Sequence, residues 1–172
     1  MPLTVLLGGA RSGKSRLAID LAAAAAAPVT FIATGEARDA EMAERIAAHR
    51  AERPAGWVTV EAPHDVEDAL SNADPAHTVI LDCLTLWVAN VLERGDDAKT
   101  ILRAAETAAT LAAARDALTI AVSNEVGLGV VPATPLGRAY RDVLGSVNAA
   151  WVAASTDAAL VVAGRRLTLE AV

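Results

Sequence analysis

Short apolar runs alternate along this chain with longer stretches in which apolar residues recur every three or four positions. The short runs, rich in Val, Ile, Thr and Leu, predict β-strands, and the longer stretches predict helices. The predicted strands are residues 3–7, 29–33, 57–61, 78–82, 118–123, 158–163 and 166–169. The predicted helices are residues 14–27, 39–52, 65–71, two stretches that end by 116, and 134–155.

This alternation predicts an α/β fold in which a mostly parallel sheet is flanked by helices. The predicted strands lack a strict apolar and polar alternation, as expected when both faces of a sheet are covered. A chain of 172 residues suits one domain spanning 1–172. Apolar residues make up 53% of the sequence but aromatic residues only 3%, so we expect a core of small aliphatic side chains.

Charge and composition argue against several classes of protein. The net charge is −6, and no block of consecutive Lys or Arg could bind a polyanion, so nucleic acid is a poor partner. The two most apolar windows, 17–34 and 146–163, contain charged or polar interruptions, so no membrane span is predicted. The first residues lack a basic leader, and we expect a cytoplasmic protein. The single cysteine, Cys83, is expected in the core.

The stretch GGARSGKS at 8–15 joins the first predicted strand to the first predicted helix. It fits the phosphate-binding pattern G-x-x-x-x-G-K-[ST], with Gly8, Gly13, Lys14 and Ser15 at the fixed positions. In this setting, backbone N–H groups and the helix N-terminus can point at anionic oxygens. Lys14 would reach the β- and γ-phosphates, and the Ser15 hydroxyl would ligate Mg²⁺. The alternative is an ordinary glycine turn with an incidental lysine.

A phosphate-bound Mg²⁺ also needs a hard oxygen ligand from a carboxylate, usually at the end of an adjacent buried strand. Asp82 ends the apolar run 78–82 and is the candidate for this second ligand. Alternatively, Asp82 caps the helix that begins near Leu84. Both roles could coexist.

One histidine stands out by its neighbours. Arg45, His49 and Arg53 recur every four residues, so on a helix they form one ridge, flanked by Met42 and Ile46 at the spacing of a buried stripe. A ring nitrogen of a neutral imidazole can attack phosphorus, while the arginines hold nucleotide phosphates. The alternative is a solvated basic helix end that stops at Arg53, before a proline.

A second polar motif, NEVG at 124–127, follows the strand predicted at 118–123. It therefore falls at the carboxyl end of a strand, where open α/β sheets bind ligands. Asn124 and Glu125 could orient phosphate, metal or a substrate hydroxyl, or they could cap a helix. Further polar residues recur at roughly helical spacing, and half or more of them are expected to face solvent: Arg138, Arg141, Asp142 and Asn148.

Five stretches together resemble a known family: GGARSGKS, IATGEARDAEMAERIAAHRAERP, LDCLTLWVANVL, VSNEVGLGVVP and GRAYRDVLGSVN. The sequence is similar to the bifunctional adenosylcobinamide kinase/adenosylcobinamide-phosphate guanylyltransferases of cobalamin biosynthesis. The resemblance runs nearly from end to end. Its most specific part is the ordered combination of HR..RP..W at 49–57 with NEVG at 124–127.

The resemblance implies a RecA-like P-loop fold, a homotrimer, and two activities in one chain. It implies that His49 carries GMP covalently and that Lys14 serves the phosphate chemistry. Mg²⁺ would be held by Ser15 and Asp82. The resemblance also implies nucleotide contacts from Gly8, Gly9, Ala10, Arg11, Ser12, Gly13, Lys14, Ser15, Thr34, Gly35, Glu36, Arg50, Ala51, Glu52, Arg53, Glu61 and Asp82.

Two reactions follow from this resemblance. The first phosphorylates the aminopropanol hydroxyl of adenosylcobinamide with ATP or GTP. The second transfers GMP from GTP, through His49, to adenosylcobinamide phosphate and gives adenosylcobinamide-GDP. Two alternatives remain at this point: a monofunctional P-loop kinase of another small molecule, and a nucleotide-gated regulatory NTPase.

Overall fold

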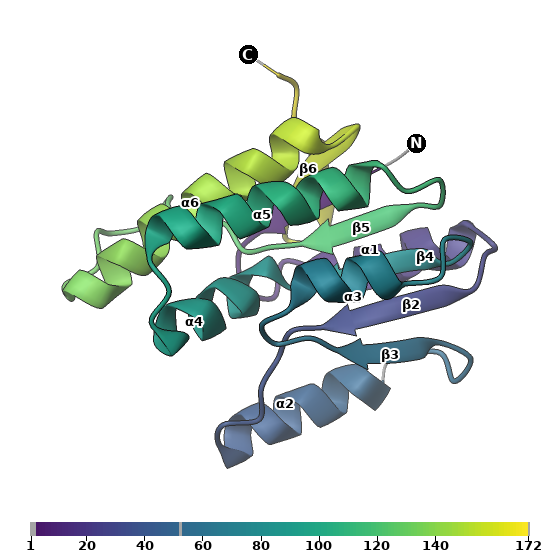
Figure 1. Ribbon diagram of the computed structural model, residues 1–172, viewed down its shortest axis with the longest axis horizontal. Helices are drawn as coiled ribbons and strands as arrows, with labels where there is room; N and C mark the ends of the chain where they lie inside the picture. Colours follow the sequence, from purple (N-terminus) through teal and green to yellow (C-terminus); the bar gives the residue numbers. More distant parts are fainter. Residues whose placement is uncertain (1–2, 52, 172) are drawn as a thin grey trace.

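The computed structural model describes residues 3–51 and 53–171 and is organised around one seven-stranded sheet (Figure 1). The strands are β1 (Leu3–Gly8), β2 (Val29–Ala33), β3 (Val58–Glu61), β4 (Thr78–Asp82), β5 (Thr119–Val122), β6 (Asp157–Val162) and β7 (Arg165–Thr168). The helices are α1 (Lys14–Ala24), α2 (Ala40–Ala51), α3 (Val66–Asn72), α4 (Leu84–Arg94), α5 (Ala98–Ala113) and α6 (Pro135–Ala154).

The order of strands across the sheet is β3-β2-β4-β5-β1-β6-β7. All neighbouring strands pair in parallel except β6 and β7, which form an antiparallel hairpin at one edge. The predicted α/β fold with a mostly parallel sheet is therefore confirmed. The ends of several elements differ: α1 ends at Ala24 instead of residue 27, because the chain turns through Ala26, at φ 52°, before Pro28.

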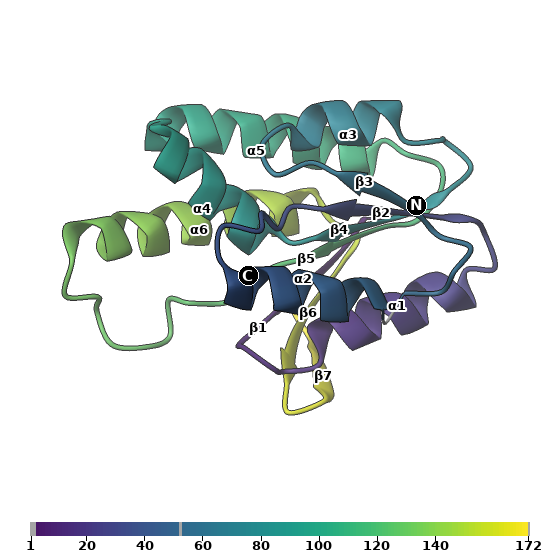
Figure 2. The ribbon, with the colours of Figure 1, turned by 90° about the horizontal axis from the view of Figure 1, so that it is seen from below.

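Side chains of successive strand residues point to opposite faces, and helices cover both faces. Leu3, Val5 and Leu7 of β1 pack in one apolar cluster with side chains of α3, α4, α5 and α6. Leu6 packs in a second cluster with Ala18 and other residues of α1. Figure 2 shows this layering, with α1 and α2 below the sheet and α3 and α5 above it.

Helix α2 is the least buried of the helices. None of its side chains is buried, and Met42 and Ile46, expected to form a buried stripe, are only half-buried. The expectation of a buried stripe is therefore wrong. The helix lies near the edge strand β3 (Figure 1), and its remaining positions are alanine, histidine or charged residues that contribute little apolar area.

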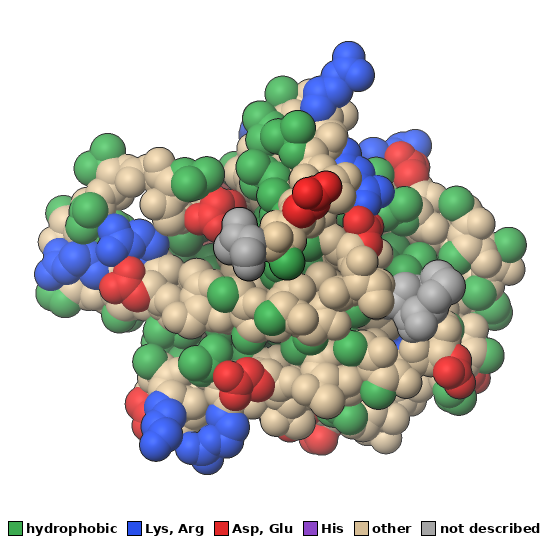
Figure 3. Space-filling model, turned by 90° about the horizontal axis from the view of Figure 1, so that it is seen from above, with side chains coloured by type: hydrophobic (Ala, Val, Ile, Leu, Met, Phe, Trp, Pro, Cys, Tyr) green, Lys and Arg blue, Asp and Glu red, His purple; other side chains and the backbone are tan. Residues whose placement is uncertain are grey.

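Surface and helix properties complete this picture. No helix within the described ranges is both long and apolar enough to cross a bilayer. On the face shown in Figure 3, Lys and Arg side chains lie in separate groups with acidic side chains between them.

Cys83 packs against the apolar cluster on the α1 face but is half-buried, and burial raises the pKa of its thiol to about 12.

Candidate active site

The loop between β1 and α1 has a backbone that requires glycine at two positions of the motif. A Cβ on Gly8 would lie 2.3 Å from the carbonyl oxygen of Val161 in β6. Gly13 is the N-cap of α1 and is left-handed, with φ 101°. The amide of Gly164, in the β6–β7 turn, donates to the Ser12 carbonyl at 2.8 Å and holds the loop against the hairpin. The observed backbone of the loop therefore depends on glycine at positions 8 and 13.

The N-terminus of α1 is open to an anion. Its N-cap makes no side-chain hydrogen bond, and no acidic residue lies in the first turn. The first N–H groups of the helix therefore remain available to a negatively charged ligand. Lys14 is buried beneath the loop, and its Nζ donates to the Gly9 carbonyl at 2.7 Å and to Ser12 Oγ at 3.3 Å. Burial lowers the pKa of Lys14, and the nearby Cys83 and Asp82 oppose that shift.

Asp82, at the carboxyl end of β4, brings several of the predicted residues together. Burial raises the pKa of this carboxyl group. The nearby His49, the Ser15 hydroxyl, and the positive charges of Arg53 and Lys14 favour the ionised form and oppose the shift. A single carboxyl group therefore lies close to the P-loop lysine, the P-loop serine and side chains near the end of α2.

The route by which Asp82 reaches the P-loop differs from the expectation. Strand β4 is separated from β1 by β5, so Asp82 is not at the end of an adjacent strand. Helix α1 packs across β1, β5 and β4, and this crossing brings its first turn to Asp82. The capping alternative is wrong as well, because the N-cap of α4 is Cys83 and makes no side-chain cap.

The expected ridge of three basic residues is also corrected. His49 is exposed near the end of α2, but Arg53 lies two residues beyond the helix, because the proline that follows disfavours a helical conformation before it. The Arg53 guanidinium instead lies over the Phe31 ring of β2, 3.7 Å from its centroid. Its Nη1 donates to Thr59 Oγ1 of β3 at 3.3 Å.

The segment that joins β2 to α2 contains three predicted nucleotide contacts. Thr34 is fully buried, and its hydroxyl donates to the Cys83 carbonyl at 2.7 Å and accepts from the Cys83 amide at 2.8 Å. Gly35 is half-buried, and Glu36 forms an ion pair with Arg38 at 2.8 Å. The Thr34 side chain therefore ties this segment to the residue after Asp82.

The remaining predicted contacts lie around the end of α2 and the rim of the loop. Arg50 forms an ion pair with Glu61 of β3, and both side chains are exposed. Their charges also act on Arg53, which connects this pair with the Asp82 cluster. Gly9, Ala10 and Arg11 form the exposed rim of the loop, and Ala51 is exposed. Glu52 lies outside the described residues.

The NEVG motif lies beside the P-loop. The Glu125 amide donates to the Gly8 carbonyl at 3.1 Å, and the Asn124 amide donates to Thr85 Oγ1 at 2.7 Å. Helix α6 begins only at Pro135, so the capping alternative for Asn124 and Glu125 is wrong. Asn148 is buried, and its Nδ2 donates to the Asn124 carbonyl at 3.0 Å.

The other polar residues of α6 lie nearer the surface. Asp142 is exposed and pairs with the half-buried Arg141 at 2.9 Å. Arg138 is half-buried and donates to the carbonyls of Pro132 and Ala133 at 3.0 Å. Of the four residues at helical spacing, only Asn148 therefore reaches the region of the P-loop.

The residues present fit a Mg²⁺ ion. The Ser15 hydroxyl and the Asp82 carboxylate supply hard oxygen ligands at the N-terminus of α1. A cation at this position would favour the ionised carboxylate against the burial that raises its pKa. In residues 3–51 and 53–171, no three His, Cys, Asp or Glu side chains cluster as metal ligands. The other ligands would be phosphate oxygens and water, as is common for Mg²⁺.

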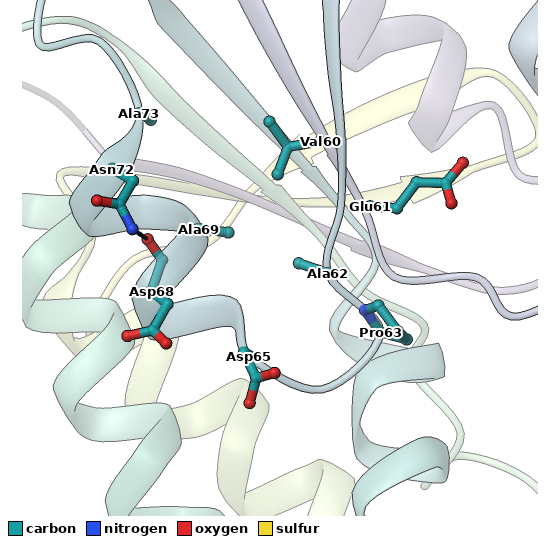
Figure 4. A pocket seen from close by; sticks show the side chains of 9 residues that line it. All are labelled: Val60, Glu61, Ala62, Pro63, Asp65, Asp68, Ala69, Asn72 and Ala73. Atoms are coloured by element: carbon teal, nitrogen blue, oxygen red, sulfur yellow. Dashed lines mark hydrogen bonds between the residues drawn. The ribbon is translucent and has the colours of Figure 1, made fainter.

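A separate cavity of about 360 Å³ lies between β3 and α3 (Figure 4). Its lining includes Glu61, Asp65 and Asp68, and in Figure 4 the Glu61 side chain points away from the two aspartates. None of its lining residues belongs to the P-loop. Among the predicted site residues, the cavity is lined only by Glu61.

The polar residues that sequence reasoning missed lie on α4 and next to it. Thr85 and Ser123 are buried and support the NEVG motif, and Asn90 bonds to the segment after β2. The signal for Asn90 was an amide among apolar residues of a helical stretch, LTLWVANVL.

The fold and this loop define the class of the protein: a RecA-like P-loop protein. A solved structure of the RadB recombinase aligns with a TM-score of 0.53 at 15% sequence identity, covering 92% of this chain and 73% of that one. The likeness supports the fold alone.

The model of the cobinamide kinase / cobinamide phosphate guanyltransferase family matches residues 4–169, and the chain belongs to this family. It is 42% identical over 167 residues to the bifunctional adenosylcobalamin biosynthesis protein CobP of Pseudomonas aeruginosa, covering 96% of each chain. It is 38% identical over 175 residues to the CobU protein of Escherichia coli, covering 94% of this chain and 96% of that one. The resemblance stated from the sequence is therefore confirmed, and the chain is an enzyme of this family.

Proposed function

We propose that this chain catalyses two successive reactions on a corrinoid. It phosphorylates the aminopropanol hydroxyl of adenosylcobinamide with ATP or GTP, and it then transfers GMP from GTP, through a covalent GMP on His49, to form adenosylcobinamide-GDP. Family membership supports the pair of activities. One feature of the structure carries the assignment of residues: α1, which begins at Lys14 and Ser15, packs against β4, which ends at Asp82. His49 is near enough to favour the ionised Asp82 carboxylate.

In the kinase reaction, the P-loop and the N-terminus of α1 hold the phosphates of the donor. Lys14 neutralises charge on the β- and γ-phosphates, and Ser15 and Asp82 would hold Mg²⁺, which would offset phosphate charge when bound. The corrinoid hydroxyl attacks the γ-phosphorus and loses its proton to solvent. The bond between the γ-phosphorus and its bridging oxygen breaks, and the nucleoside diphosphate leaves.

In the guanylyl transfer, a ring nitrogen of His49 attacks the α-phosphorus of GTP. The bond to the β-phosphate oxygen breaks, and pyrophosphate leaves. A phosphate oxygen of adenosylcobinamide phosphate then attacks the same phosphorus, the P–N bond breaks, and the imidazole is restored. His49 is exposed on α2, so it is accessible to a bulky acceptor. The proposed nucleotide contacts come from the P-loop, from Thr34–Glu36 and from three residues near the end of α2: Arg50, Arg53 and Glu61.

The test uses two labels on one preparation. With α-labelled GTP, we expect an acid-labile, base-stable adduct on the wild-type protein, as a phosphoramidate at histidine requires. His49→Ala should lose the adduct and the guanylyl transfer, while phosphorylation of the corrinoid with γ-labelled ATP continues. Lys14→Ala should lose both reactions, because one loop holds the triphosphate in each. His64→Ala, a half-buried histidine that follows β3, is the matched control and should retain both.

Each result that contradicts these expectations would assign a different role to His49 or a different function to the protein. A full adduct on folded His49→Ala would move the nucleophile to another residue. Loss of both reactions by folded His49→Ala would make it a residue that positions phosphates. Absence of both the adduct and corrinoid phosphorylation on the wild type, with phosphorylation of another small molecule, would favour the monofunctional kinase. Nucleotide hydrolysis without a corrinoid product would favour the regulatory NTPase.

A homotrimer belongs to the same proposal. The segment between β5 and α6 exposes large apolar side chains, with Leu128 82% and Val130 95% exposed. In Figure 2 this segment projects away from the sheet. Exposed apolar side chains gathered on one segment are typical of a protein interface. Light scattering after size-exclusion chromatography should give the mass of three chains, and Val130→Asp should reduce it if this segment lies in the interface.

A further inference from the structure

Asn90 is a buried polar residue whose role the two reactions do not explain. It lies on α4 between Trp87 and Val91, both buried, and is itself only 5% exposed. A buried amide without hydrogen bonds would cost free energy, so its partners show what it does in the fold.

All the side-chain hydrogen bonds that the structure shows for Asn90 reach segments outside α4. Its Nδ2 donates to the Thr34 carbonyl at 2.8 Å and to the Pro63 carbonyl at 2.9 Å. Its Oδ1 accepts from Arg38 Nη2 at 3.1 Å. Both N–H groups and the oxygen of the amide are thus in use. Arg38 is in turn paired with Glu36 and with Glu93 of α4. The amide therefore links α4 to the segments that follow β2 and β3.

The segment held in this way leads directly into α2. Thr34 lies immediately after β2, and Arg38 lies two residues before α2 begins. Because α2 contributes no buried side chain, its packing alone constrains its position weakly. Its position then depends on contacts at its two ends. Arg53 stacked on Phe31 holds the end after α2, and the amide of Asn90 with Arg38 holds the end before it.

We infer that Asn90 is a positioning residue for α2: through Thr34 and Arg38 it sets where the helix begins, and so where His49 lies. The consequence for catalysis rests on the proposed role of His49 as nucleophile. A misplacement of about 1 Å in a reacting group can lower a rate by about 100-fold. The P-loop lies at the end of β1 and makes none of the hydrogen bonds of the Asn90 amide, so guanylyl transfer is affected more than phosphorylation.

The experiment compares Asn90→Ala and Arg38→Ala with Arg94→Ala as the control. Arg94 is an exposed arginine at the end of the same helix, and its ion pair with Asp96 does not involve the β2–α2 segment. Amide hydrogen exchange of residues 40–51 is measured beside that of β1, β4 and β5. We expect exchange in α2 to rise by about tenfold in both test variants, with the strands unchanged. The rate of adduct formation should fall by about tenfold or more, while the kinase rate stays near that of Arg94→Ala.

Arg38 is partly exposed, so its variant keeps the test open if Asn90→Ala fails to fold. Unchanged exchange of residues 40–51 in the folded variants would overturn the inference. Faster exchange across the whole sheet as well as α2 would also overturn it, because Asn90 would then contribute only to global stability. Absence of an adduct on the wild type would contradict the proposed role of His49 as nucleophile. The comparison of hydrogen exchange would still decide whether Asn90 positions α2.

Discussion

The guanidinium of Arg53, two residues beyond α2, lies over the ring of Phe31 at the centre of β2, 3.7 Å from its centroid. Phe31 is buried in the apolar cluster on the α1 face. Burial lowers the pKa of Arg53, an effect that the Asp82 carboxylate opposes. The same side chain therefore holds the end of α2 and supplies positive charge to the site.

This relationship distinguishes two arginines that the sequence placed on one ridge. Arg53→Ala should lower the melting temperature, because it removes a cation–π contact worth about 0.5–2 kcal/mol. It should also slow adduct formation from GTP. Arg45→Ala should change neither, because Arg45 is exposed and its pairing with Glu41, at 4.0 Å, is worth little. Calorimetry and labelled-GTP kinetics check both, and equal effects of the two substitutions would contradict this assignment.

Asp82→Asn should stabilise the metal-free protein at neutral pH. Because burial raises the pKa of Asp82 above 3.8, the folded state binds this proton more tightly than the unfolded state. The ionised carboxylate therefore costs stability, and the cost grows as the pH rises from the ordinary value through the raised folded value. We expect a melting temperature above wild type at pH 7, with the difference shrinking towards acid pH, measured by calorimetry with a chelator present.

The same substitution should weaken the response to Mg²⁺. A neutral amide is a poorer ligand for a hard divalent ion, so Mg²⁺ with nucleotide should raise the melting temperature of Asp82→Asn less than that of wild type. Equal shifts in the two proteins would remove Asp82 from the metal site. A lower melting temperature of metal-free Asp82→Asn at pH 7 would show that its neighbouring cations outweigh its burial.

Two neighbouring glycines test how tightly the loop is packed. A Cβ on Gly8 meets the Val161 carbonyl oxygen at 2.3 Å, and a shift of the β6 backbone is needed to relieve it. Gly8→Ala should lower the free energy of unfolding by about 1–3 kcal/mol. Gly9→Ala meets no atom within 4 Å, so it should stay within about 0.5 kcal/mol of wild type. Urea denaturation measures both, and a similar loss in the two variants would show that Gly8 is not specially confined.

Local patterns determined much of the fold. The alternation of apolar runs with helical stretches predicted the strands and helices, because burial and side-chain periodicity act over a few residues. The loop from Gly8 to Ser15 was recognisable for the same reason, because its glycines are required by the local backbone conformation and by close backbone contacts. The prediction of an arginine ridge was wrong at Arg53. This residue precedes a proline, which disfavours the helical conformation before it, so Arg53 lies outside the helix.

Only the tertiary structure decided which of these residues meet. Asp82 lies near Ser15 although β5 separates β4 from β1, the strand before α1, because α1 crosses the sheet over β5 and β4. Asn90 lies 56 residues after Thr34 and became its partner through the packing of α4. Such contacts depend on strand order and on the direction in which helices cross the sheet. Neither is encoded in any short stretch of sequence, because each depends on the packing of the whole chain.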